Sequence, residues 1–280
     1  MQKERIGVIG AGVMGIGVAQ NFAEKGYEVI LVDTSQEILE KAERDMNNSI
    51  RFSAFLKKEK TSENIRKRIT FTTHYECLKD VLFMIENVNE KLETKKAAYQ
   101  KMDRICKADC FFLANTSCIS ITKIAAMTSR PDKVIGVHFM NPVPLKSTVE
   151  VIKGCHTSEN TVKIIKRLLK EIGKESIVVN DYPGFVSNRI SHLFMNEAAF
   201  VVQDQVANPQ EVDAIFKQCY EHKMGPLETA DLIGLDTVVN SLDILYTSYQ
   251  DSKFRCCPLL RKMVDAGLLG RKSGKGFYEY

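Results

Sequence analysis

The sequence predicts an α/β domain built on a parallel sheet, followed by an all-α domain. Three observations support this fold class. Short apolar runs alternate with helical patterns from residue 5 onward. A turn signal, Asp-Tyr-Pro-Gly, interrupts the alternation at residues 181–184. After it the chain shows helical patterns only, so we expect domains at residues 1–181 and 182–280, a division that 280 residues allow.

The first elements form a strand-helix-strand unit. An apolar run at residues 5–9 predicts a strand, residues 13–25 predict a helix that stops at Gly26, and residues 28–32 predict the next strand. Two parallel strands joined by a helix are the repeating unit of a parallel sheet. The rhythm continues with a helix at 91–106 and strands at 81–85, 111–114, 134–138, 149–152 and 177–179.

The second half predicts helices with polar or glycine-containing connections. They are expected at residues 185–204, 209–222, 235–249 and 258–266. The sequence contains no internal repeat and no low-complexity segment.

Composition and charge narrow the class of protein. A net charge of +4, from 39 basic and 35 acidic residues, gives no argument for nucleic-acid binding. The eight cysteines include no C-x-x-C pair and no zinc-ligand spacing, so we expect reduced thiols and no metal site. No window approaches the roughly 20 apolar residues of a membrane span. The N-terminus lacks a signal-peptide pattern, and we expect a soluble cytoplasmic protein.

A glycine motif follows the first strand and opens the first helix. Its residues are Gly10, Ala11, Gly12, Val13, Met14 and Gly15, and Asp33 ends the next strand. The spacing G-x-G-x-x-G in this context predicts a dinucleotide site, with the pyrophosphate at the helix N-terminus and Asp33 on the adenosine ribose. An acid here, with no arginine in residues 34–36, favours NAD over NADP. The alternative is a glycine turn that binds no nucleotide.

Two further polar stretches follow predicted strands. Residues 115–118 are Asn-Thr-Ser-Cys, and His138 ends the strand at 134–138 with Glu150 twelve residues later. A histidine at a strand end suits a general base, and a carboxylate on its other nitrogen would fix the tautomer. The alternative is a hydrogen-bonded core histidine. Of the remaining histidines, which we interpret as structural, His192 is the reserve candidate.

Together these segments resemble the L-3-hydroxyacyl-CoA dehydrogenase family from Arg5 to Tyr280. The motifs occur in family order: GAGVMG with Asp33, residues 86–90 with Lys95, NTS at 115–117, HFMNPVP at 138–144, PGFVSNR at 183–189, MGPLETADLIGLDT at 224–237 and GRKSGKGFYEY at 270–280.

The resemblance implies a Rossmann-like dinucleotide-binding domain, then an all-α C-terminal domain that forms a homodimer, with the site in the cleft between them. His138 would be the catalytic base, Glu150 its orienting carboxylate, Ser117 a partner of the reacting oxygen and Asn188 a partner of the substrate carbonyl region. The reaction would oxidise the 3-hydroxyl of an acyl thioester, reversibly, with NAD. The cofactor would contact Gly10, Gly12, Val13, Met14, Gly15, Asp33, Glu90, Lys95 and Asn115.

A basic segment at residues 51–60 lies in a long helical stretch, where a charge run is commonly a solvated face. The resemblance places coenzyme A contacts in this region, at Ser49, Lys57 and Lys58. Positive charge there would hold the phosphates of coenzyme A or the acidic surface of an acyl carrier protein.

Departures from the family pattern bear on the substrate. Lys146 and Thr148 stand where the family has Met and Leu, and a polar lining disfavours a long alkyl chain. With Asn87, Cys118 and Leu193 these residues resemble the branch that oxidises a glyceryl-type unit on an acyl carrier protein in polyketide or hybrid antibiotic pathways. Two more alternatives are a β-hydroxyacid dehydrogenase, which relies on a catalytic lysine, and a non-catalytic NAD-binding protein such as a crystallin.

Overall fold

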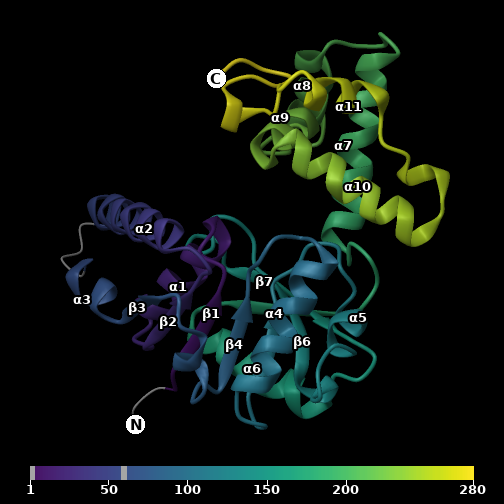
Figure 1. Cartoon of the computed structure of the whole chain (residues 1–280). Coiled ribbons are helices and arrows are strands. Elements are labelled where there is room, and N and C mark those ends of the chain that lie inside the picture. The colour runs from purple at the N-terminus through teal and green to yellow at the C-terminus, as the bar shows by residue number, and fades with distance from the viewer. Residues whose placement is uncertain (1–3, 58–61) are drawn as a thin grey trace. The chain divides into compact units, whose positions relative to one another are not determined.

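The computed structural model describes residues 4–57 and 62–280, with backbone only for residues 52–57, 62 and 63. The chain divides into two compact units, Met1–Asp181 and Tyr182–Tyr280, shown in Figure 1 and described separately below.

In the described part of the first unit, eight strands form one sheet in the order β3-β2-β1-β4-β5-β6-β7-β8. Neighbouring strands are parallel except β6 and β7, which are antiparallel. The strands are β1 Ile6–Ile9, β2 Val29–Val32, β3 Ile69–Thr72, β4 Phe83–Glu86, β5 Phe111–Ala114, β6 Val134–His138, β7 Thr148–Lys153 and β8 Glu175–Asn180.

Two features of the sheet differ from the sequence-based expectation. Strand β3 was not predicted, and β7 runs against β6 although we expected the parallel rhythm to continue. The connection at residues 139–147 is too short for a parallel crossover, which needs about a dozen residues and usually a helix. The antiparallel pairing sets His138 directly opposite Glu150.

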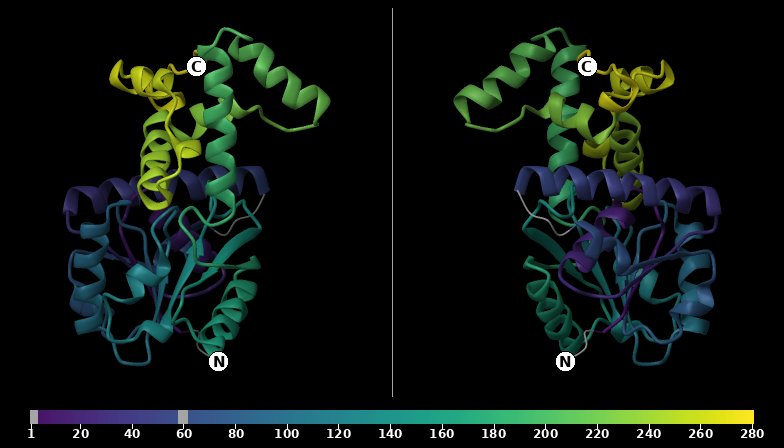
Figure 2. Two further views of the ribbon diagram at one scale, coloured as in Figure 1. Left: turned by 90° about the vertical axis from the view of Figure 1, so that its right-hand side faces the viewer. Right: turned by 90° about the vertical axis from the view of Figure 1, so that its left-hand side faces the viewer.

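Helices cover both faces of the sheet, as the two views in Figure 2 show. Helices α1, α2 and α6 share a core with the apolar residues of one face, among them Val8, Leu31 and Ile85. Helices α4 and α5 lie on the opposite face, where Tyr99 packs on Phe112 and Ile121 packs on Gly136. The helices are α1 Val13–Glu24, α2 Gln36–Lys57, α3 Ser62–Lys67, α4 Leu92–Ile105, α5 Ile121–Ala125 and α6 Glu159–Glu171, with short 3₁₀ turns at Tyr75–Leu78 and Pro131–Lys133.

The second unit is helical, as predicted, but contains one helix that the sequence analysis assigned to a connection. Helix α9 begins after Gly225 with a proline in its first turn, and its Glu228 accepts a hydrogen bond from the Gly225 N–H. The helices are α7 Ser187–Gln203, α8 Pro209–Cys219, α9 Pro226–Ile233, α10 Leu235–Tyr249 and α11 Pro258–Asp265, with 3₁₀ turns at Ser252–Phe254 and Arg271–Ser273.

Two buried aspartates attach the C-terminal tail to this helical core. Asp231 accepts hydrogen bonds from the backbone N–H groups of Phe277 and Tyr278. Asp213 accepts one from the Tyr278 hydroxyl. The two carboxylates therefore hold the glycine-containing tail against the helices through backbone and side-chain donors.

In the part of the chain that the structure describes, no helix combines the length and the apolar character that a membrane crossing requires. The eight cysteines, all among the described residues, are free thiols.

Candidate active site

The predicted polar stretches meet at one edge of the sheet, because the carboxyl ends of parallel strands lie together. The glycine motif follows β1, Asp33 follows β2, and the segments after β4 and β5 carry Glu90 and Ser117. His138 is the last residue of β6. The strand order reverses at β1, which lies between β2 and β4, and open α/β sheets bind ligands in the crevice at such a point.

Different structural constraints apply at the three glycine positions of the motif. Gly10 has φ +91°, and a Cβ at Gly15 would lie 1.7 Å from the Gly10 carbonyl oxygen, so the turn and the helix packing require both glycines. A Cβ at Gly12 would meet no described atom within 4 Å. The protein's own packing therefore does not require a glycine at position 12, and the open space there leaves room for the close approach of a pyrophosphate. Val13 and Met14 form the first turn of α1, with Val13 70% exposed.

Asp33 links the glycine motif to the end of β2. One carboxylate oxygen accepts a hydrogen bond from the Ala11 N–H at 2.8 Å, and the other accepts one from the Thr34 N–H at 2.7 Å. A carboxylate has about four acceptor positions, so capacity for ribose hydroxyls remains. The open space at Gly12, the helix N-terminus and the oriented Asp33 together fit a dinucleotide.

His138 lies between two of the predicted partners. Its Nδ1 is 3.2 Å from Glu150 Oε2, and its Nε2 is 3.3 Å from the hydroxyl oxygen of Ser117. His138 and Glu150 are both buried, with 7% of each residue exposed. The structure thus brings together three residues that are up to 33 positions apart in the sequence, and it gives each imidazole nitrogen a separate neighbour.

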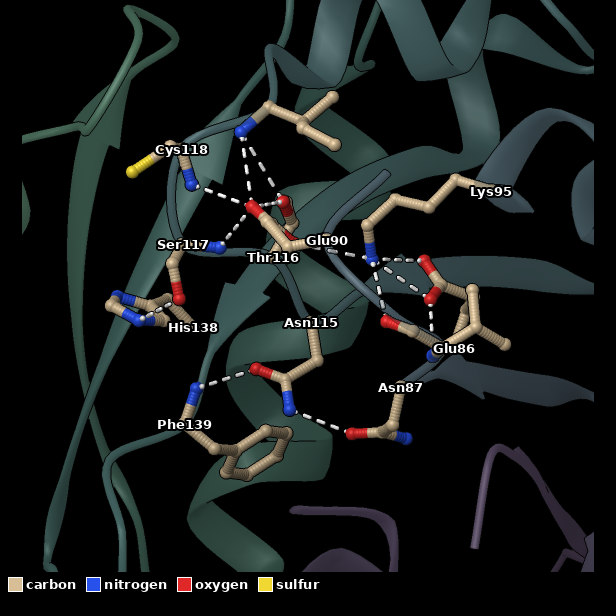
Figure 3. A network of polar contacts seen from close by, with 12 residues as sticks. Glu86, Asn87, Glu90, Lys95, Asn115, Thr116, Ser117, Cys118, His138 and Phe139 are labelled. Carbon is tan, nitrogen blue, oxygen red and sulfur yellow. Dashed lines mark hydrogen bonds and ion pairs between the residues drawn. The ribbon is translucent and has the colours of Figure 1, made fainter. Parts of the chain in front are cut away.

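Glu90 organises the segment that carries Ser117 (Figure 3). Its Oε1 accepts hydrogen bonds from the Thr116 hydroxyl at 2.5 Å and from the backbone N–H groups of Ser117 at 2.9 Å, Cys118 at 2.8 Å and Ile119 at 3.3 Å. One carboxylate oxygen therefore holds the whole turn after β5.

Lys95 holds the other side of the same network. Its fully buried ammonium group donates to Glu86 at 2.9 and 3.0 Å and lies 3.5 Å from Glu90 Oε2. Although burial raises the pKa of Glu90, the Lys95 charge and the hydrogen bonds from the turn outweigh it and hold that pKa below its ordinary value. Burial raises the pKa of Glu86, with Lys95 opposing the effect.

Asn115 joins the segments on either side of its own strand. Its side-chain amide donates to Asn87 Oδ1 at 2.6 Å, and its Oδ1 accepts from the Phe139 N–H at 3.1 Å (Figure 3). The backbone immediately after His138 is thereby fixed. Neither Thr116 nor Asn87 was predicted as a site residue: Thr116 appeared only within the NTS motif, and Asn87 only as a departure from the family pattern.

Of the five predicted substrate residues, the structure describes Ser49, Lys146 and Thr148 with their side chains. Ser49, exposed on α2, donates to Gln20 at 3.0 Å. Thr148 shares a face of β7 with Glu150, and Lys146 is exposed in the preceding loop. That loop also contacts a residue the sequence analysis missed, Lys174, which donates to the carbonyl oxygens of Val143 at 2.5 Å and Lys146 at 2.6 Å. Lys58 lies outside the described residues, and Lys57 is described only as the last residue of α2.

The remaining two candidates belong to the second unit. Asn188 lies in the first turn of α7, and its carbonyl oxygen is 3.0 Å from Nδ1 of the buried His192. This contact joins successive turns of one helix, and it supports a structural role for His192.

Comparison with protein-family models gives two matches that together cover almost the whole chain. Residues 5–182 match the 3-hydroxyacyl-CoA dehydrogenase NAD binding domain, and residues 184–280 match the 3-hydroxyacyl-CoA dehydrogenase C-terminal domain.

Individual proteins are similar over their full length. The chain is 42% identical to the probable 3-hydroxybutyryl-CoA dehydrogenase of Bacillus subtilis, covering 100% of this chain and 98% of the relative. It is 42% identical to the 3-hydroxybutyryl-CoA dehydrogenase of Clostridioides difficile, covering 99% of each. The crystal structure of (S)-3-hydroxybutyryl-CoA dehydrogenase from Ralstonia eutropha matches with a TM-score of 0.93 and 40% identity, over 99% of each chain.

Proposed function

Since the chain belongs to the 3-hydroxyacyl-CoA dehydrogenase family, we propose that His138 is the general base with which it oxidises the 3-hydroxyl group of a short acyl-CoA. The protein is an NAD-dependent 3-hydroxyacyl thioester dehydrogenase. The observation that supports the role of His138 is its position between the Ser117 hydroxyl and the Glu150 carboxylate.

Each site residue has a separate role in the proposed reaction. When bound, NAD supplies the acceptor for the hydride that leaves C3. His138 Nε2 takes the proton of the 3-hydroxyl group, and Glu150 stabilises the imidazolium that forms at the other nitrogen. The Ser117 hydroxyl donates a hydrogen bond to the reacting oxygen, and Asn188 holds the carbonyl region of the thioester. In the reverse direction the His138 imidazolium returns the proton to the oxygen.

The cofactor residues predict a test of nucleotide preference. Replacing Asp33 with alanine removes a charged acceptor for the ribose hydroxyls and the repulsion of a 2′-phosphate. Hydrogen bonds to charged groups contribute about 1.5–3 kcal/mol each, so we expect NADH to bind about 10- to 100-fold more weakly. NADPH should lose much less affinity. Fluorescence titration with both nucleotides measures the two dissociation constants.

The matched control for this experiment is Asp45→Ala, which removes an exposed carboxylate from α2. It should leave both dissociation constants unchanged. An unaltered ratio of NADH to NADPH affinity in Asp33→Ala would remove Asp33 from the ribose site.

The proposal also covers the acyl group of the substrate and the molecule that carries its thioester. The relatives at 42% identity carry the name 3-hydroxybutyryl-CoA dehydrogenase, which favours a short acyl chain on coenzyme A over a glyceryl unit on a carrier protein. The exposed Lys146 and the half-buried Thr148 agree with a short chain, because they offer little apolar surface to a long one.

Side-by-side assays test this assignment. NADH formation at 340 nm is measured with L-3-hydroxybutyryl-CoA, L-3-hydroxydecanoyl-CoA and glyceryl-acyl carrier protein. We expect kcat/KM to be highest for the four-carbon CoA ester, and to fall by about tenfold or more for the ten-carbon ester because Lys146 and Thr148 offer the added methylenes little apolar surface. Turnover confined to the carrier-bound unit would contradict the assignment and make Lys146 and Thr148 determinants of that substrate.

We also propose that the chain acts in the cytoplasm as a homodimer formed through residues 182–280. The support is the family resemblance together with large apolar side chains exposed on this unit, including Ile190 at 63% and Leu232 at 52%.

A further inference from the structure

The turn after β5 is built around a single carboxylate oxygen. Three consecutive backbone N–H groups, from Ser117, Cys118 and Ile119, and the Thr116 hydroxyl all converge on Glu90 Oε1. Successive N–H groups that point inward form a concave anion site, which here is filled by a side chain of the protein itself. Because these donors are committed to Glu90, the group that this turn directs to His138 is the Ser117 hydroxyl.

Glu90 is held in place from the opposite side. The Lys95 ammonium group lies 3.5 Å from Glu90 Oε2, and it is anchored by the carboxylate of Glu86 at the end of β4. The Glu86 carboxylate also accepts a hydrogen bond from the Val88 N–H at 2.6 Å, so the segment from residue 86 to 90 folds around Lys95. Lys95 and Glu86 are 0% exposed, which leaves little freedom in the position of Glu90.

We propose that Glu90 is a positioning residue that acts through Ser117: its carboxylate fixes the turn so that the Ser117 hydroxyl stays within reach of His138 Nε2. The inference rests on the proposed roles of His138 and Ser117. It assigns Glu90 a second task besides the contact with the cofactor that the family resemblance implies.

The two tasks predict different kinetics. A residue that only contacts the cofactor, once removed, raises the KM for NAD and the dissociation constant of NADH. A residue that positions Ser117 lowers kcat, because a displacement of about 1 Å at a reacting group can reduce the rate about 100-fold. Glu90→Gln tests the difference, since the amide keeps an acceptor oxygen of the same size and loses the charge that orients the donors.

The experiment is a double-mutant cycle with Ser117→Ala, which keeps the backbone N–H that binds Glu90 and removes the hydroxyl. We expect Glu90→Gln alone to lower kcat by about 10- to 100-fold. In the Ser117→Ala protein the same change should lower kcat less than about threefold, because residues that act as a unit are not additive. The NADH dissociation constant is measured for every variant.

Thr116→Val provides a milder second probe if Glu90→Gln folds poorly. It removes the 2.5 Å hydrogen bond to Glu90 and nearly preserves the shape of this buried side chain. The decrease in kcat that Thr116→Val causes should likewise become small when Ser117 is already replaced by alanine. The control is Glu93→Gln, an exposed carboxylate in the first turn of α4, which should leave kcat and NADH affinity unchanged.

Additive losses in the cycle would overturn the inference and leave the proposed function intact. A Ser117→Ala protein with full kcat would overturn both the inference and the role of Ser117, whereas the role of His138 is tested separately by its own substitution. A change confined to the NADH dissociation constant would assign Glu90 to cofactor binding only.

Discussion

Replacing His138 with alanine should lower kcat by about 100- to 10,000-fold, the range that a positioned general base contributes. The imidazole is the group at this sheet edge with one nitrogen beside a hydroxyl, Ser117, and the other beside a carboxylate, Glu150. Alanine leaves the 3-hydroxyl proton without an acceptor of suitable basicity. NADH formation from L-3-hydroxybutyryl-CoA under saturating NAD measures the effect.

The NADH affinity of the His138→Ala protein should stay close to that of the wild type, because the glycine motif follows β1 and Asp33 follows β2, whereas His138 ends β6. His156→Ala, which removes an exposed imidazole, is the matched control and should retain full kcat. Turnover by the His138→Ala protein within about threefold of the wild type would remove His138 from the mechanism.

Local patterns predicted most of the sheet. Strands β5 and β6 have the predicted boundaries, because each is a continuous apolar run buried on both faces. Strand β3 was missed because it is a four-residue edge strand, Ile-Thr-Phe-Thr, with only Ile69 fully buried. A strand that alternates apolar and hydroxyl side chains over four residues gives too little periodicity to separate it from a loop.

The direction of β7 could have been predicted from loop length but not from its own residues. Its apolar alternation is the same whether it runs parallel or antiparallel, and only the nine residues between β6 and β7 distinguish the two. Helix α9 was not predicted because it is short and begins like a turn. Its eight residues span little more than two turns, and Gly225 before it and Pro226 at its start are also typical of a turn.

The sequence predicted candidate site residues one at a time but not the network that joins them. Strand ends identified His138, Asp33 and the stretch 115–118 as candidates, and the family resemblance implied the role of Ser117 within that stretch. The hydrogen bonds that Glu90 accepts join residues 26 to 29 positions apart, and the bond that Asn115 donates to Asn87 spans 28 positions. No period or spacing encodes such a contact, because it depends on which strands become neighbours in the sheet.

The strand pairing supports the proposed role of Glu150. Antiparallel pairing of β6 with β7 sets the side chains of His138 and Glu150 opposite each other on one face of the sheet, and both are buried. In a buried environment an imidazolium is costly unless a charge balances it. A carboxylate fixed by the sheet itself provides that balance without any rearrangement during the reaction.

Glu150→Gln should therefore lower kcat by about 100-fold or more, because a glutamine of equal size lacks the charge that stabilises the imidazolium. If Glu150 acts through His138, adding Glu150→Gln to His138→Ala should cause little further loss, since residues that act as a unit are not additive. The exposed Glu175 of β8 supplies the control substitution, Glu175→Gln. Losses that multiply in the double variant would assign Glu150 to the stability of the β6–β7 pair instead, and a thermal melt of each variant would show the matching destabilisation.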